Sequence, residues 1–279
     1  MGLNFKNVGT PLGPTSYTYI QNDVILYALG IGAGVKEELD FVYEKHLKVF
    51  PTFCVVPPSV EVSGWHQLVN INMRQLVQLA HEIKLFALIP SSGTVYTTTV
   101  YHPIYDRGDS GALIHMTGET RDENGRLLFV NRCTLLDRSA GNFGGDPGPL
   151  ERKLSPPDGR RPDFQVVYPT STNQAAIYRL SGDKNPMHID PDFAPLGGFS
   201  RPILHGLCTF GLAGRAILHQ ICQSNPERLR SFSARFAGVV FPGETLVTLG
   251  WRIGFNTYVV QTKTEDDRLV LDNGVVEIA

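Results

Sequence analysis

The chain has 279 residues, of which 42% are hydrophobic and 19% charged, the composition of one large globular domain or two modest ones. Its formal net charge of −2 argues against a chain-wide basic surface for nucleic acid or anionic membranes, and no apolar run approaches the ~18 residues of a membrane span. The four scattered cysteines form no Cys-x-x-Cys pair, which argues against a zinc knuckle or a disulfide framework and favours a reducing compartment.

The first part of the chain predicts an extended segment followed by helices. Residues 1–21 are rich in Gly, Pro, Thr and Tyr, which is typical of extended structure. Apolar spacing predicts helices over 22–30, with Asn22 as a possible cap, and over 35–48. A proline-bounded apolar run follows at 51–58, and residues 68–79 again show apolar residues at helical spacing.

From Gly93 the apolar pattern changes to a period of two, which predicts strands over 94–105, 112–120 and 126–136. Tight turns between them at 106–111 and 121–125 indicate an antiparallel meander. Residues 139–163, rich in Gly and Pro, read as a linker. Beyond it we expect helices over 172–180 and 202–224, then a second meander of strands over 245–253, 257–265 and 269–278.

The second half repeats the order of the first, which indicates an internal duplication. Tyr27-Ala-Leu29 matches Tyr178-Arg-Leu180, and Pro51 matches Pro202, both 151 positions apart. Phe86-Ala87 with Gly93 matches Phe236-Ala237 with Gly243 at an offset of 150. We therefore expect a repeat at 1–138, a linker at 139–163 and a second repeat at 164–279.

One segment of the second repeat carries a candidate acid–base pair, Asp183 and His188, with Asn185-Pro186 between them. Proline disfavours helix at the residue before it, so a loop is expected to present both side chains. A carboxylate and a neutral imidazole near one water can act as base and acid. A purely structural alternative stays open: Asp183 could form an Asx-turn, and His188 could precede a helix capped by Asp190.

Gly206 falls in the first turn of the long helix predicted from Pro202. A helix N-terminus offers unpaired N–H groups, and glycine lets a ligand approach them closely, so a thioester oxygen could be stabilised there. Close packing is the open alternative, because small residues recur along the same helix at Gly211, Ala213, Gly214 and Ala216.

Other site types find little support in the sequence. Gly30-x-Gly32-x-Gly34 has the wrong spacing for dinucleotide binding, and there is no Gly-x-Ser-x-Gly elbow or phosphate loop. One Asp and one His do not make a metal site. His205, beside Gly206, is more typical of a satisfied buried histidine than of a catalytic base.

The residues 178–188, Tyr-x-Leu-Ser-Gly-Asp-x-Asn-Pro-x-His, followed by Pro-Ile-Leu-His-Gly-Leu-Cys-Thr-Phe-Gly at 202–211, resemble the (R)-specific enoyl-CoA hydratase 2 family within the MaoC-like dehydratases. With the two-repeat layout, the resemblance covers essentially the whole chain. The chain is most similar to the hydratase 2 module of peroxisomal multifunctional enzymes of type 2.

The resemblance implies an α+β double hot-dog fold, in which two antiparallel sheets each wrap a central helix. The helix of the first repeat would be partly degraded around Pro51–Pro58. It also implies a reaction, the reversible hydration of trans-2-enoyl-CoA to (3R)-3-hydroxyacyl-CoA in fatty acid β-oxidation, with no cofactor and no metal. The first repeat would be non-catalytic and would contribute to the acyl-CoA pocket.

Residue by residue, the resemblance makes Asp183 and His188 the catalytic pair, with Asn185 orienting the pair or the water. Gly206 would supply a backbone N–H to the thioester carbonyl, and Phe236 would line the substrate site. Three further substrate contacts are carried over from the first repeat: Ala80, His81 and Arg107, the last a cation suited to the phosphates of CoA.

The chain ends in Val-Val-Glu-Ile-Ala279, without a Ser-Lys-Leu-type address, so a peroxisomal location follows from the resemblance alone. We expect a homodimer, and a module of a longer chain that includes a (3R)-hydroxyacyl-CoA dehydrogenase. Two alternatives stay open: an acyl-CoA thioesterase on the same fold, and a non-catalytic acyl or sterol carrier.

Overall fold

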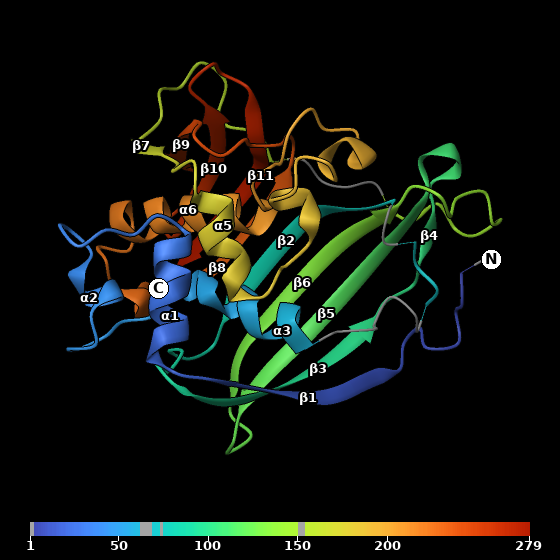
Figure 1. The fold of residues 1–279 in the computed structure, drawn as a ribbon, viewed down its shortest axis with the longest axis horizontal. Helices are drawn as coiled ribbons and strands as arrows, with labels where there is room; N and C mark the ends of the chain where they lie inside the picture. The colour runs from blue at the N-terminus through green and yellow to red at the C-terminus, as the bar shows by residue number, and fades with distance from the viewer. Residues whose placement is uncertain (1–2, 62–68, 73–74, 150–153) are drawn as a thin grey trace.

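The structure, a computed structural model, describes residues 3–61, 69–72, 75–149 and 154–279. The described strands form one 11-stranded sheet, in the order β1-β3-β5-β6-β2-β8-β11-β10-β9-β7, with β4 paired to β5 (Figure 1). The strands are β1 (Pro11–Tyr19), β2 (Leu76–Leu85), β3 (Gly93–Tyr101), β4 (Tyr105–Asp106), β5 (Ala112–Asp122), β6 (Leu127–Asp137), β7 (Phe164–Pro169), β8 (Leu229–Phe236), β9 (Thr245–Arg252), β10 (Thr257–Thr264) and β11 (Leu269–Ile278).

The helices of the described chain are short except for two. The α-helices are α1 (Gln21–Gly30), α2 (Leu39–Val42), α3 (Val56–Glu61), α5 (Gln174–Tyr178) and α6 (Gly206–Gln220). The 3-10 turns are η1 (Pro51–Val55), η2 (Gly108–Ser110), η3 (Arg179–Ser181), η4 (Pro186–His188), η5 (Ala194–Gly197) and η6 (Pro226–Arg228). None of the helices that the structure describes is both long and apolar enough to cross a membrane.

The strand order is palindromic, which confirms the internal duplication. The first half runs β1-β3-β5-β6-β2 and the second half runs β8-β11-β10-β9-β7, so each strand has a counterpart at the mirrored place in the sheet. The two halves meet where β2 pairs antiparallel with β8, with Ile83 opposite Phe232. The two predicted sheets are therefore joined edge to edge into one, and the expected double hot-dog architecture is confirmed.

Helix α6 is the long helix that the second half wraps, as predicted. Its buried residues include Phe210, Leu212 and Ile217, and its small residues allow close contact with the first half. A Cβ built on Gly211 would lie 2.4 Å from Ile31 Cγ2, and one on Gly214 would lie 2.4 Å from Thr52 Cγ2. These two glycines are therefore packing residues, and they let α6 reach the first half without a gap.

Among its described residues, the first half has no helix as long as α6. In the place of α6 it has η1 and the six-residue α3, as expected from the prolines between 51 and 58. In Figure 1, α3 is a short helix in front of the first-half strands, and it contacts β1 and β3. A shorter helix covers less of the sheet, and this difference opens space on the first-half side.

Several local predictions were wrong. The predicted helix over 35–48 is reduced to α2, and residues 76–79 begin strand β2 rather than a helix. The residues 62–68 and 73–74 of that second prediction lie outside the described chain. Ile20, not Asn22, caps α1, and its N–H donates to the Asp23 carboxylate at 2.8 Å. Long-range strand pairing outweighs local helical spacing at 76–79, because this part of β2 pairs with β6 and the strand continues into residues 80–84, which pair with both β6 and β8.

A buried ion cluster holds the two halves together beside α6. Glu38 of the first half accepts hydrogen bonds from Arg215 Nη2 at 2.8 Å and from His219 Nε2 at 2.7 Å, both on α6, and from the Gly34 N–H at 2.9 Å. Burial pushes the pKa of Glu38 up, but the hydrogen bonds from His219, Arg215 and Gly34 outweigh it and bring the pKa down to about 2. The Arg215 guanidinium also lies 3.9 Å above the Tyr168 ring.

Candidate active site

The loop after α5 brings Asp183 and His188 together. Gly182 adopts a φ of +134°, a region that favours glycine, and turns the chain out of η3 into this loop. The Asn185 N–H donates to Asp183 Oδ1 at 3.1 Å. The Asn185 side chain in turn accepts the Met187 N–H at 3.1 Å, which starts the 3-10 turn that ends at His188. Asn185 thus orients both members of the pair.

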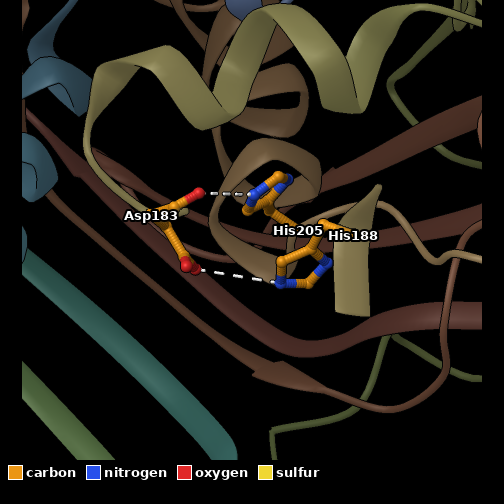
Figure 2. Close-up of side chains that lie close together, drawn as sticks. All are labelled: Asp183, His188 and His205. Carbon is orange, nitrogen blue, oxygen red and sulfur yellow. Dashed lines mark hydrogen bonds and ion pairs between the residues drawn. The ribbon is translucent and has the colours of Figure 1, made fainter. Parts of the chain in front are cut away.

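The two side chains face each other within the loop (Figure 2). His188 Nε2 lies 3.8 Å from Asp183 Oδ2, and His188 Nδ1 lies 2.9 Å from the Ile203 carbonyl oxygen. Because a carbonyl oxygen only accepts, Nδ1 carries the proton of the neutral ring, and Nε2 is left as the acceptor that faces Asp183. Burial lowers the pKa of His188, while Asp183 and the Ile203 hydrogen bond oppose the shift.

The Asx-turn expected for Asp183 is present, and it leaves the second carboxylate oxygen facing His188. Asp183 Oδ1 accepts the main-chain N–H two residues on, which is the Asx-turn, while Oδ2 faces His188. Asp190 does not cap a helix: its carboxylate accepts the Asp192 N–H at 2.8 Å within a turn. The side chain of Asp183 is 46% exposed and that of His188 only 10%, so the carboxylate is more accessible to solvent than the ring it faces.

Gly206 is the first residue of α6, and its N–H has no hydrogen-bond acceptor among the described residues. A Cβ built on Gly206 would lie 3.1 Å from Cε1 of the Phe236 ring. Unlike Gly211 and Gly214, Gly206 is exposed and lines a cavity. The glycine therefore keeps the helix N-terminus open beside the acid–base pair.

The cavity measures about 940 Å³ and crosses from the second half into the first. From the second half it is lined by Asp183, Lys184, Asn185, His188, Gly206 and Phe236, among others. From the first half it is lined mainly by apolar residues of η1, α3 and the strands β2, β5 and β6, including Val55, Val56, Pro58, Leu76, Met116 and Leu135. The short first-half helix thus leaves a chamber next to the pair.

His81 lies in the cavity wall, but both of its ring nitrogens are occupied. Gln78 Nε2 lies 3.0 Å from Nδ1, and Asn131 Oδ1 lies 2.9 Å from Nε2. Burial lowers the pKa of His81 to about 4, so the ring is neutral at pH 7. Ala80, the preceding residue, pairs with Thr134 and Arg235 in the sheet and is not among the residues that line the cavity.

Arg107 lies at the end of the first-half strands, and the structure does not bring it into the cavity wall. Its guanidinium donates to the Pro149 carbonyl at 3.1 Å. Arg138, directly after β6, does line the cavity and is exposed. Sequence reasoning missed Arg138. The sequence did offer one signal, a cationic residue at the end of a predicted strand, on the side of the turn that follows β4. The Arg107 N–H bonds the Gly111 carbonyl, and Gly111 lies against the Arg138 backbone, so the two arginines lie in adjoining segments.

A second, smaller cavity is lined by residues of both halves, and part of its wall is equivalent to part of the wall of the larger cavity. It measures about 360 Å³, and its lining residues Ala87, Leu88 and Ile89 stand 150 positions before Ala237, Gly238 and Val239 of the larger cavity. Where the second half has Asp183, His188 and Gly206, the first has Gly32, Glu37 and Val55. The first half therefore lacks an equivalent of the candidate pair, and Val55 lines the larger cavity instead.

A third ionisable side chain, His205, lies against the pair, and potential metal-binding atoms of Asp183, His188 and His205 lie within 4.8 Å of one another. The two rings are stacked, with centroids 3.7 Å apart and planes 28° apart. Ring nitrogens in nearly parallel planes direct their lone pairs side by side rather than to one point, whereas zinc requires convergent ligands. The geometry fits acid–base chemistry better, and the absence of a metal or cofactor stays a prediction.

Comparison with known proteins gives two adjoining family matches: an MFE-2 hydratase 2 N-terminal domain over residues 17–139 and a MaoC-like domain over residues 153–273. The chain is 38% identical to a probable enoyl-CoA hydratase 2 of Dictyostelium discoideum, over 98% of this chain and 95% of that protein. It is 40% identical to a peroxisomal multifunctional enzyme type 2 of Drosophila melanogaster, over 90% of this chain but only 44% of that protein.

Solved structures agree with these matches. A MaoC-like dehydratase from Phytophthora capsici superposes with a TM-score of 0.89 at 31% identity and covers 98% of both chains. A protein of Mycobacterium tuberculosis described as a double hotdog fold superposes with a TM-score of 0.61 over 97% of this chain and 96% of its own; at 15% identity it supports the fold alone.

Proposed function

We propose, because this chain belongs to the MaoC-like dehydratase family, that it reversibly adds water to trans-2-enoyl-CoA and forms (3R)-3-hydroxyacyl-CoA in fatty acid β-oxidation. Its relatives named enoyl-CoA hydratase 2 support hydratase activity. The observation that carries the residue assignment is the geometry of the pair: Asp183 Oδ2 and His188 Nε2 lie 3.8 Å apart, next to an open helix N-terminus in a cavity.

The pair is spaced to share one water molecule. A separation of 3.8 Å exceeds a direct hydrogen bond, and a water about 2.8 Å from each atom would bridge the two. Around neutral pH the depressed pKa of His188 keeps Nε2 available as a proton acceptor. The bridging water therefore has its oxygen lone pair free to attack the substrate.

The thioester carbonyl would accept the Gly206 N–H. This hydrogen bond draws electron density from the double bond, so that C3 becomes electrophilic and the charge at C2 is delocalised onto the carbonyl oxygen. The water oxygen bonds to C3, the pair takes one proton from the water, and one proton passes from the pair to C2. The net charge of the pair is the same before and after the reaction. We assign the transfer to Asp183 and His188 jointly, because coupled groups titrate as a pair.

The chamber on the first-half side would hold the acyl chain. Its walls include Val55, Leu76, Met116 and Leu135. Because the first-half helix is short, the chamber and the Asp183–His188 pair belong to one cavity. We therefore expect turnover of long enoyl-CoA substrates as well as short ones. Strict short-chain specificity in a chain-length series would contradict this part of the proposal.

Location and assembly follow from the relatives. Peroxisomal relatives support a peroxisomal location, and the match to 44% of the Drosophila enzyme supports a place in a longer chain. The match to 30% of a peroxisomal hydratase-dehydrogenase-epimerase of Neurospora crassa supports a (3R)-hydroxyacyl-CoA dehydrogenase in that chain. Relatives such as the Dictyostelium protein are covered almost whole, so both arrangements occur among them. A homodimer is a further expectation, which sedimentation of the purified protein tests.

The decisive experiment follows the loss of enoyl-thioester absorbance with purified protein and then determines the configuration at C3 of the product. A (3R) product without release of the CoA thiol supports the proposal. Thiol release with no hydration would indicate a thioesterase, and binding of the acyl-CoA without turnover would indicate a carrier.

A further inference from the structure

His205 contacts three parts of the candidate site at once. It is 1% exposed and immediately precedes Gly206 as the N-cap residue of α6. Its Nε2 lies 3.1 Å from the main-chain oxygen of Asp183, and its ring stacks on that of His188 with centroids 3.7 Å apart. Figure 2 shows the two rings side by side and both facing Asp183, which is bonded to the His205 ring through its carbonyl and faces the His188 ring through its carboxylate.

The hydrogen bonding of His205 fixes its tautomer. The Asp183 carbonyl can only accept, so Nε2 carries the proton and Nδ1 carries a lone pair. Nδ1 is buried and has no hydrogen-bond partner in the described part of the chain. An unpaired buried acceptor lowers stability, so a histidine retained only for packing would be inferior here to an apolar side chain.

The charged and titratable groups around His205 are Asp183, His188 and Arg179, with the Tyr178 ring centroid at 5.0 Å. Burial, together with His188 and Arg179, lowers the pKa of His205 to about 4, against the opposing effect of Asp183. His205 is therefore neutral at pH 7, and it presents an uncharged face to the His188 ring.

We propose that His205 is a positioning residue for the hydration: it holds the His188 ring by stacking and the Asp183 carboxylate through the Asp183 main chain. This inference rests on the proposed function. His205 does not exchange a proton with substrate, because one nitrogen is bonded to the Asp183 carbonyl and the residue is almost wholly buried.

Two substitutions separate the two contacts. His205→Phe keeps a ring against His188 but cannot donate to Asp183, and His205→Gln keeps a donor but loses the stacked ring. We expect each to lower kcat about tenfold, the scale of one lost contact, with KM for the enoyl-CoA changed less than about twofold. His205→Ala, which loses both contacts, should lower kcat about 10²-fold.

A double-substitution cycle tests whether His205 acts through the pair. In an Asp183→Asn, His188→Gln background, His205→Phe should change kcat by less than about twofold, because there is no longer a pair to position. His102→Phe is the matched control: His102 is exposed, bonds Thr117, and should leave kcat unchanged. A full tenfold loss from His205→Phe in the background lacking the pair would overturn the proposal, as would KM rising in step with the fall in kcat.

Nuclear magnetic resonance of the imidazole nitrogens provides a readout that does not depend on turnover. In the wild-type protein we expect His188 to be neutral and protonated at Nδ1, and its resonances should broaden or split in His205→Gln but stay single in His205→Phe. Unchanged His188 resonances in all three variants would overturn the proposal. Absence of hydration by the wild type would instead refute the proposed function, and the two failures are thus distinguishable.

Discussion

Replacing Asp183 by asparagine keeps the shape of the side chain and removes its charge. When the pair holds the proton of the attacking water on His188, the imidazolium lies 3.8 Å from the Asp183 carboxylate. Coulomb's law gives this contact about 1 kcal/mol at the dielectric constant of water and about 4 kcal/mol at the effective value of about 20 used near protein surfaces. Since the Asp183 side chain is 46% exposed, solvent screening places the contact toward the lower figure.

Loss of the charge is not the whole effect, because asparagine also cannot carry a proton. Positioned proton transfer contributes about 10²- to 10⁴-fold, or about 3 to 5 kcal/mol. We therefore expect Asp183→Asn to lower kcat for hydration at least about 10²-fold. The Asn185 N–H can still bond the amide oxygen, so the loop should keep its shape.

The assay is initial-rate hydration of a trans-2-enoyl-CoA, with circular dichroism to establish that the variant is folded. Asp192→Asn is the matched control: this exposed residue, nine positions further along the chain, is not among those that line the cavity. Near-full activity in folded Asp183→Asn would falsify the catalytic assignment. A comparable loss in Asp192→Asn would show that the effect is not specific to the pair.

Four further outcomes are expected. His188→Gln should lower hydration at least about 10²-fold, measured in the same assay, since glutamine does not take up a proton. Arg138→Ala should raise KM for the CoA ester more than it lowers kcat, because Arg138 is an exposed cation in the cavity wall. Arg107→Ala is the matched comparison, and an unchanged KM in that variant would show that Arg107 is not part of the substrate site. The free energy of unfolding should fall as pH drops from about 6.5 to 4, because the pKa values of His81 and His205, both about 4, lie below the value of a histidine in the unfolded chain. In this pH range the unfolded chain therefore binds more protons than the folded one. Urea unfolding at pH 7 and pH 5 checks this prediction, and equal stability at both would contradict it. Glu38→Gln should destabilise the fold by about 3 kcal/mol in the same unfolding experiment, because it leaves the buried Arg215 without its anion; a change below about 1 kcal/mol would refute that role.

Local patterns in the sequence predicted those elements whose contacts are with residues nearby in the chain. The period-two strands of both meanders, the helix around Gly206 and the loop that presents Asp183 and His188 all follow from patterns within about 15 residues. Strands β7 and β8 were missed, β1 was predicted only as extended structure, and β2 was mistaken for a helix, because these strands are defined by partners far along the chain. Helical spacing at 76–79 could not reveal that these residues pair with β6, about 60 positions further along the chain.

The same division applies to the site. Gly206 was identified from its place at a helix start, and Asp183 and His188 from their spacing and motif. The stacking of His205 on His188 depends on how the 183–188 loop folds back over the start of α6, and no local pattern encodes that contact. Arg138 was overlooked for a similar reason, since the cavity wall it joins is assembled from both halves.

The pairing of β2 with β8 means that the chain does not need to be continuous to stay assembled. If a protease cleaved the chain at the turn formed by Asp158 and Gly159, the two fragments would still be joined by the main-chain hydrogen bonds between β2 and β8 and by the Glu38–Arg215 ion pair. Either fragment alone would present an unpaired strand edge, which is prone to aggregation. Co-expression of the two should therefore restore, by complementation, a protein that neither piece can form by itself.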